Sequence, residues 1–184
     1  MILTDREIQV ALATNQIQIE PAPAADAYSS TSVDLRLGSR TRVWRREVAG
    51  VSRVFSPADP DFQYRIVVEE MAVQQEMGAD GIVLGPREFV LAWTAESVSL
   101  PIRSRLAARV EGKSSLARLG IGVHVTAPTI HAGFEGQIQL EIYNHGTLRV
   151  RLVPTMPVCQ LIFEQTFGTP DQGYQGQFQR QVAG

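Results

Sequence analysis

Residues 111–120 are the first segment whose side chains could do chemistry. The segment offers the cations Lys113 and Arg118, the hydroxyls of Ser114 and Ser115, and a short helix predicted to start near Ser114. Free N–H groups at a helix start, together with hydroxyls and cations, bind anions such as phosphate. The spacing does not match the glycine-rich Walker loop, so that fold is not implied. On this pattern alone, an N-capped surface turn with solvated charges is the alternative.

The carboxylate of Glu141 is a second candidate. Residues 137–143 alternate between apolar and polar side chains, which predicts a strand with one face in the core. The apolar face consists of Ile138, Leu140 and Ile142, and the polar face of Gln137, Gln139, Glu141 and Tyr143. The polar face either lines a polar site or is exposed to solvent, and the pattern alone leaves both open.

Two histidines and the chain end are weaker candidates. His124 and His131 lie seven residues apart with Glu135 nearby, but Pro128 interrupts regular structure between them and the spacing fits no zinc site. We therefore expect His124 to be a core or interface histidine. Residues 173–177, Gly-Tyr-Gln-Gly-Gln, could close over a ligand, although flexible chain ends often have the same composition.

The composition excludes several classes of protein. The 184 residues are 44% apolar with a net charge of -2, which fits one domain with a full core and argues against a nucleic-acid surface. The 17 basic residues are 16 Arg and the single Lys113, and Cys159 is the one cysteine, so neither an internal disulfide nor a paired-cysteine zinc site is expected. We find neither a long apolar run nor a signal peptide at the start, and we expect a cytoplasmic protein without a membrane partner.

Short elements must position these residues. Thr4 and Glu7 predict a capping box at the start of a helix that ends near Asn15. Residues 45–63 are expected to form a long loop. Elsewhere in the chain, short runs in which apolar residues recur at every second position indicate strands. Gly and Pro separate these runs at intervals typical of an all-β sandwich or barrel. The predicted strands are residues 33–37, 64–68, 81–84, 88–93, 137–143, 148–152 and 158–163.

Together these segments resemble the dCTP deaminase family, within the trimeric dUTPase-like superfamily. The most specific match is residues 113–120, Lys-Ser-Ser-Leu-Ala-Arg-Leu-Gly, followed at the family spacing by residues 124–127, His-Val-Thr-Ala. Residues 140–144 match the segment that holds the catalytic glutamate, and residues 173–177 resemble the tail that folds over the nucleotide. The resemblance runs through most of the chain, with further matches at residues 3–8, 32–38 and 96–101.

The resemblance implies a mainly β fold. This is a distorted β-barrel of the dUTPase-like, β-clip type, with a short N-terminal helix and a short helix after Lys113-Ser114-Ser115. Residues 1–184 would form one domain, in which the mobile tail, residues 168–184, closes over the active site. The implied assembly is a homotrimer with active sites between subunits.

The implied reaction is the hydrolytic deamination of dCTP to dUTP and ammonia. Mg²⁺ would be bound through the substrate triphosphate, and the protein would hold no zinc. Zinc deaminases need paired cysteine ligands, so the single Cys159 independently favours a zinc-free mechanism.

The resemblance also assigns roles to single residues. Glu141 would act as general base and acid, activating water for attack on cytosine C4 and passing the proton to the departing amine. The Ala127 carbonyl would orient the water or the amine, and Ser114 and Arg118 would bind phosphate oxygens or hold the water. Lys113 and Ser115 would extend the phosphate site. The other implied substrate-binding residues are Thr129, His131, Gln139, Gln160, Tyr174 and Gln177.

Three positions depart from the family pattern. Thr129 and His131 stand where many members carry Arg and Asp, and Gly173 stands where a phosphate-binding Lys often lies. The Asp of related dUTPases positions the sugar and the hydrolytic water, so His131 counts against a dUTP pyrophosphatase or bifunctional enzyme more than against a deaminase. Those two functions stay open as alternatives, with dUTP or dTTP as further ligands. A non-catalytic trimeric nucleotide-binding protein is the other alternative.

Overall fold

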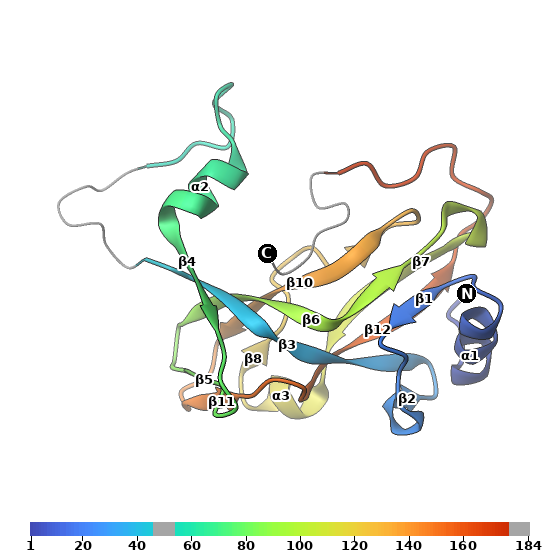
Figure 1. Ribbon diagram of the computed structural model, residues 1–184, viewed down its shortest axis with the longest axis horizontal. Helices are drawn as coiled ribbons and strands as arrows, with labels where there is room; N and C mark the ends of the chain where they lie inside the picture. Colours follow the sequence, from blue (N-terminus) through green and yellow to red (C-terminus); the bar gives the residue numbers. More distant parts are fainter. Residues whose placement is uncertain (46–53, 177–184) are drawn as a thin grey trace.

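The computed structural model describes residues 1–45 and 54–176, which form strands and a few short helices (Figure 1). Two 3₁₀ turns, η1 (Ala25–Ala27) and η2 (Ile102–Ser104), join strands. The helices are α1 (Asp5–Ala13), α2 (Tyr64–Met71) and α3 (Ser114–Arg118). The strands are β1 (Gln18–Glu20), β2 (Tyr28–Ser29), β3 (Ser32–Trp44), β4 (Ala72–Glu76), β5 (Ile82–Leu84), β6 (Phe89–Ser99), β7 (Leu106–Gly112), β8 (Ile121–Gly122), β9 (Thr129–Ile130), β10 (Glu135–Asn144), β11 (Val150–Leu152) and β12 (Pro157–Gln165).

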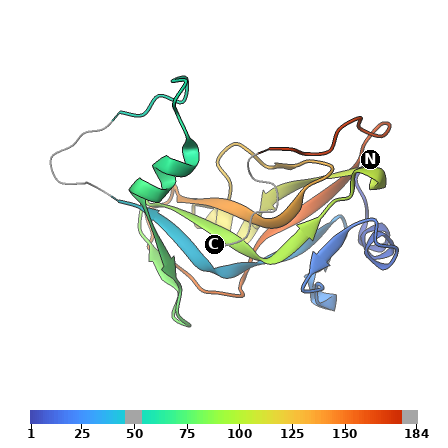
Figure 2. The same ribbon diagram turned by 45° about the horizontal axis from the view of Figure 1, so that its top comes forward.

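One antiparallel sheet organises these strands. Its order is β8-β10-β6-β3-β12-β7-β9, with β1 added on β6 and with β2 and β4 added on β3. A separate two-stranded sheet pairs β5 with β11. The long sheet curls into a half-barrel (Figure 2). The predicted fold class, a mainly β protein of dUTPase-like architecture with short helices, is confirmed.

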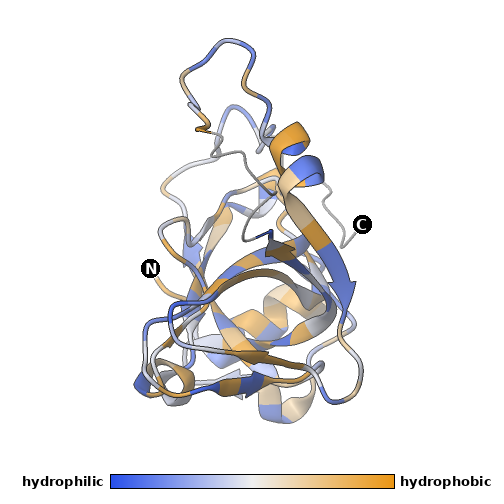
Figure 3. Cartoon of the chain, turned by 90° about the vertical axis from the view of Figure 1, so that its left-hand side faces the viewer, coloured by the Kyte–Doolittle hydropathy of each residue, from blue (hydrophilic) through white to orange (hydrophobic). Residues whose placement is uncertain are grey.

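Alternation along the strands builds the core. In β10 each second residue is buried, from Ile138 through Leu140 and Ile142, as the sequence pattern predicts. Apolar and polar residues alternate along the ribbons in Figure 3. Cys159 is fully buried in β12, and burial raises the pKa of its thiol far above the ordinary value. Cys159 therefore packs as a small hydrophobic side chain.

The strand predicted over residues 64–68 is wrong, because this segment is the start of α2. Tyr64, Val67, Val68 and Met71 recur at helical spacing and are the shielded residues of the segment. The β-branched run favoured a strand only because a window ending at Val68 is too short to show the helical period. Arg65 and Glu69, four residues apart, form a surface ion pair at 2.9 Å.

The other differences concern element ends and six strands that were not predicted, β1, β2, β4, β7, β8 and β9. Thr4 is the residue before α1 as predicted, but its hydroxyl contacts the Glu7 carboxylate and no side-chain cap to the backbone forms. The helix ends at Ala13, and Asn15 takes the left-handed conformation that terminates it, close to the predicted end. Strand β7 was not predicted, although Leu106, Ala108 and Val110 alternate in the way that predicts one.

Candidate active site

Strand β10 positions the carboxylate of Glu141 on its polar face. The backbone N–H of Glu141 donates to the Val123 carbonyl at 3.1 Å, and the Val125 N–H donates to the Glu141 carboxylate at 3.0 Å. The loop after β8 is therefore bonded to both the backbone and the side chain of Glu141. Such a backbone donor fixes one carboxylate oxygen and leaves the other available for a ligand.

A bulge in β6, opposite Ile138 of β10, sets the register just before Glu141. Pairing with β6 shifts between Gln137 and Gln139, and the Ile138 N–H at this shift donates to the Thr94 hydroxyl at 3.0 Å. That hydroxyl in turn donates to the Glu96 carbonyl at 2.7 Å. A bulge leaves a backbone group without its ladder partner, and here the buried Thr94 hydroxyl takes its place.

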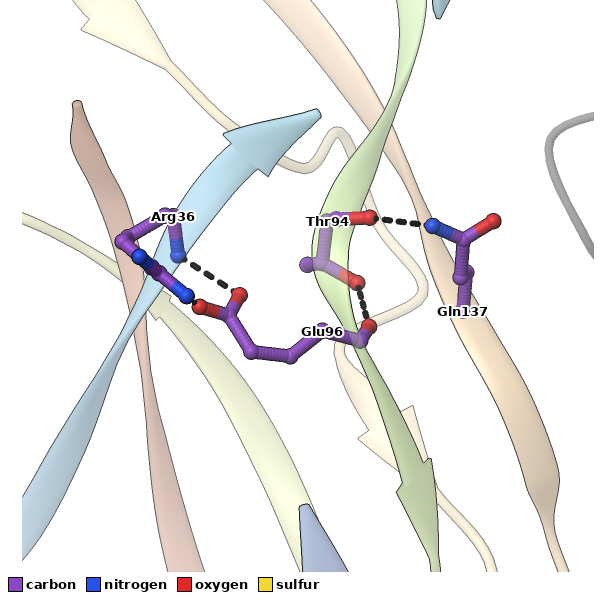
Figure 4. A network of polar contacts seen from close by, with 4 residues as sticks. All are labelled: Arg36, Thr94, Glu96 and Gln137. Atoms are coloured by element: carbon purple, nitrogen blue, oxygen red, sulfur yellow. Dashed lines mark hydrogen bonds and ion pairs between the residues drawn. The ribbon is translucent and has the colours of Figure 1, made fainter. Parts of the chain in front are cut away.

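A buried ion pair supports the same part of β6. The Glu96 carboxylate accepts from the Arg36 backbone N–H at 2.8 Å and from its guanidinium at 2.6 Å, and Gln137 donates to the Thr94 carbonyl at 2.9 Å (Figure 4). Glu96 is 2% exposed, so this carboxylate is structural. The network joins β3, β6 and β10 at the bulge.

Glu141 lies in a pocket of about 310 Å³. The pocket brings together six of the predicted site residues, which come from β10, from β9 and the segments on either side of it, and from the chain end. Those six are Ala127, Thr129, His131, Gln139, Glu141 and Tyr174. Gln139 and Glu141 are half-buried in this pocket, which favours the alternative in which the polar face of β10 lines a polar site.

Seven pocket residues were not predicted as site residues, and three of them have side chains that bear on the site. Phe134 is an apolar wall, and Tyr64 reaches the pocket from the first turn of α2. Burial raises the pKa of Tyr64, with Glu141 raising it further and Arg42 lowering it, so its hydroxyl stays protonated at neutral pH. His124, expected in the core or at an interface, lines the pocket instead, and its buried Nδ1 has no partner among the described residues. The helical period of residues 64–71 was the one sequence signal for Tyr64.

The other predicted residues lie outside this pocket. Ser114, Ser115 and Arg118 are exposed on α3, at the lower edge of Figure 1, whereas the chain end leading to Gly176 runs along the upper edge. The predicted helix start at Ser114 is confirmed. Gln177 lies outside the described residues.

The side chains of Lys113 and Gln160 make polar contacts with residues of the same chain. The Lys113 ammonium contacts the Asp34 carboxylate. Gln160 pairs with Asp34 across β12 and β3, and its amide oxygen accepts from the Ser32 hydroxyl at 3.1 Å. In a single chain, the proposed phosphate ligands and the Glu141 pocket are thus separate groups.

The donor set does not suit a metal held by the protein. Within residues 1–45 and 54–176, no three His, Cys, Asp or Glu side chains converge as ligands. The absence of zinc stays a prediction, and so does Mg²⁺ on the substrate. In the same ranges, none of the helices combines the length and apolar character that crossing a membrane requires.

Comparison with known proteins decides the family. A family model described as dCTP deaminase-like matches residues 2–166. The chain belongs to the dCTP deaminase-like family. The family predicted from the sequence motifs is confirmed, and with it the prediction that this chain is an enzyme of that family.

Individual relatives agree with this family. The chain is 40% identical over 174 residues to the dCTP deaminase of Shewanella sp. (strain W3-18-1), covering 95% of this chain and 89% of that protein. It is 35% identical over 181 residues to the "dCTP deaminase, dUMP-forming" of Sulfurihydrogenibium sp. (strain YO3AOP1), covering 98% and 93%.

Solved structures agree with the fold of this family. The crystal structure of 2'-deoxycytidine 5'-triphosphate deaminase from Agrobacterium tumefaciens matches with a TM-score of 0.65 and 26% identity, over 88% of this chain and 47% of that chain. The chain therefore spans about half of that solved protein. A Staphylococcus bacteriophage 80alpha dUTPase mutant shares the fold, with a TM-score of 0.52 and 12% identity over 89% of this chain and 98% of that one.

Proposed function

We propose that this protein hydrolyses dCTP to dUTP and ammonia without zinc, with Glu141 as general base and acid. One observation carries the proposal: the Glu141 carboxylate is anchored by a backbone N–H inside a walled pocket of a dCTP deaminase-like chain. Glu141 takes a proton from water while the water oxygen bonds to cytosine C4, and ring N3 is protonated. A second proton reaches the amine, the C4–N bond breaks, and ammonia departs. The water oxygen stays on C4 as the carbonyl of uracil.

The residues around Glu141 bind and orient the reactants in this proposal. The Ala127 carbonyl orients the water or the amine, Thr129 and Gln139 contact the nucleotide within the pocket, and His131 lies at the pocket edge. Tyr174 and Gln177, on the tail of residues 168–184, cover the nucleotide. Mg²⁺ arrives with the triphosphate and belongs to the substrate.

We further propose that the active site forms between copies in a homotrimer. Arg118, Ser114 and Ser115 are exposed and lie outside the Glu141 pocket of their own chain, which supports their use by a neighbouring copy. Arg118 binds phosphate through its guanidinium, and Lys113, Ser114 and Ser115 extend that site. Ser114 and Arg118 also hold the attacking water, and Gln160 reaches the nucleotide from the same side.

The direct test incubates the pure protein with dCTP and Mg²⁺ and measures both products. Equal amounts of ammonia and dUTP are the expected result. Tight dCTP binding without either product would overturn the proposal in favour of a nucleotide-binding protein.

Co-expression tests the shared site. Alone, Glu141→Gln chains are expected to be nearly inactive, and Arg118→Ala chains to keep about a tenth of the activity or less. Random mixing in a cyclic trimer restores about a quarter of the sites, because one copy must supply an intact Glu141 and its neighbour an intact Arg118. A mixture no more active than its parents would refute a site built from two copies.

A dUMP-forming enzyme is the second candidate, because one 35% identical relative carries that name. Against it, Glu141 holds the one carboxylate among the described residues that line the pocket. Pyrophosphate release would need a second positioned water. Chromatography of the products separates the functions: dUMP with pyrophosphate as main products supports the second candidate, and dUTP supports the first.

A further inference from the structure

His131 lies in a tight turn between β9 and β10 that is bonded at both ends. The Phe134 N–H donates to the His131 carbonyl at 3.1 Å, and the Gly133 N–H donates to the Leu100 carbonyl at 2.6 Å. The His131 side chain is exposed on one side and lines the Glu141 pocket on the other. The turn is therefore a fixed platform at the edge of the pocket.

Tyr174 of the chain end lies on this platform. Its N–H donates to the Ala132 carbonyl at 2.9 Å. Its ring stacks on His131, with centroids 5.7 Å apart and planes 13° from parallel, and it contacts Phe134 at 6.1 Å with a tilt of 52°. Near-parallel and tilted aromatic pairs at these distances attract one another beyond simple burial.

The glycines at this contact let the two backbones approach closely. Gly133 has φ 90°, and a Cβ atom there would lie 2.7 Å from the Tyr174 nitrogen and 2.8 Å from the Gly173 Cα. Real Cβ atoms do not come so close to backbone. The turn therefore accepts the chain end at Tyr174 only because residue 133 lacks a side chain.

We propose that His131 is a positioning residue whose ring holds Tyr174 over the pocket before substrate binds. The platform, the stack and the backbone bond at residue 174 all act on the same residue, which also lines the pocket with Glu141. His131 acts through Tyr174 rather than through a hydrogen bond to the nucleotide. The effect on turnover rests on the proposed function, whereas the effect on the chain end does not.

Hydrogen exchange of the nucleotide-free protein tests the positioning directly. In peptides covering residues 169–176, His131→Ala is expected to exchange faster, and His131→Phe, which keeps a stacking ring, is expected to match the unaltered chain. His145→Ala is the matched control, because His145 is exposed and contacts Tyr143 outside the pocket. Unchanged exchange in His131→Ala would overturn the proposal.

Kinetics with dCTP test the functional consequence. His131→Ala is expected to raise KM about 3- to 10-fold with little change in kcat, as loss of an aromatic contact predicts. His131→Phe should restore KM, and adding His131→Ala to Tyr174→Ala should change nothing more. If His131→Phe is as poor as His131→Ala while its chain end stays protected, His131 contacts the nucleotide itself and the proposal is wrong. If no variant turns over dCTP but exchange follows the expected pattern, the proposed function fails and the positioning role stands.

Discussion

The Glu141 pocket and the surface around α3 hold their polar groups in opposite ways. Glu141 is half-buried, bonded to the Val125 N–H and enclosed by walls from β10, the segments flanking β9, α2 and the chain end. Arg118 and the two serines of α3 are exposed, and α3 is fixed to the fold mainly by the buried Leu116. One region is a preformed cavity, and the other is a group of exposed side chains that we propose bind phosphate.

The difference has a physical meaning. A carboxylate that moves protons needs exclusion of bulk water and a fixed orientation, which a curved sheet supplies. Phosphate oxygens need only cations and donors within reach. In the proposed function these regions are two complementary half-sites, and the following variants are designed to break one half without the other.

Replacing the pocket carboxylate should have the largest effect. Glu141→Gln keeps an oxygen that accepts from the Val125 N–H, so the fold should survive while kcat falls by about 10²- to 10⁴-fold. The measurement is the initial rate of ammonia release from dCTP. Glu135→Gln, on the same strand but outside the pocket, is the matched control. Retained activity in Glu141→Gln would remove it from the reaction.

Breaking the α3 half should have the next largest effect. Arg118→Ala removes a charge-assisted hydrogen bond to phosphate, so kcat/KM for dCTP should fall about 10- to 150-fold. Arg149→Ala, another exposed arginine, should leave the rate unchanged. Equal losses in the two variants would mean that general surface charge, rather than Arg118, attracts the substrate.

A side chain at Gly133 should loosen the pocket cover. Gly133→Ala meets the backbone of residues 173 and 174, so KM for dCTP should rise about tenfold if aromatic and backbone contacts to Tyr174 are both lost. Gly168→Ala has a matching φ of 89° but no atom within 4 Å. It therefore controls for backbone strain alone. An equal KM in both variants would show that the contact with the chain end is unimportant.

Loss of the Thr94 hydroxyl at the β6 bulge should have the smallest effect on turnover. Thr94→Val leaves the Ile138 N–H unpaired in the core, so the free energy of unfolding should fall by about 1–3 kcal/mol. Urea unfolding measures this loss. Thr41→Val is the control, because that buried hydroxyl makes only a long 3.4 Å contact with the Gln75 carbonyl. An equal loss of stability in both variants would show that the Thr94 hydroxyl is not specifically required at the bulge.

Local patterns predicted much of the fold. The alternation around Glu141 correctly assigned the buried and polar faces of β10, and the spacing at Ser114 predicted the start of α3. Prediction failed at Tyr64, where the β-branched residues outweighed a helical period that continues to Met71. It also failed for Thr4, because the hydroxyl of an exposed cap can satisfy a nearby carboxylate instead of the backbone.

The sequence by itself therefore determined the residue types, the strand faces and the family. Only the tertiary structure decided which of those residues meet, since contacts depend on the order β8-β10-β6-β3-β12 and not on distance along the chain. In the folded chain Tyr64 and Tyr174 line one pocket with Glu141, and Arg118 lies outside it. The physical reason is that side-chain period is a local property, whereas strand pairing and the bulge at Ile138 are set by partners far away in sequence.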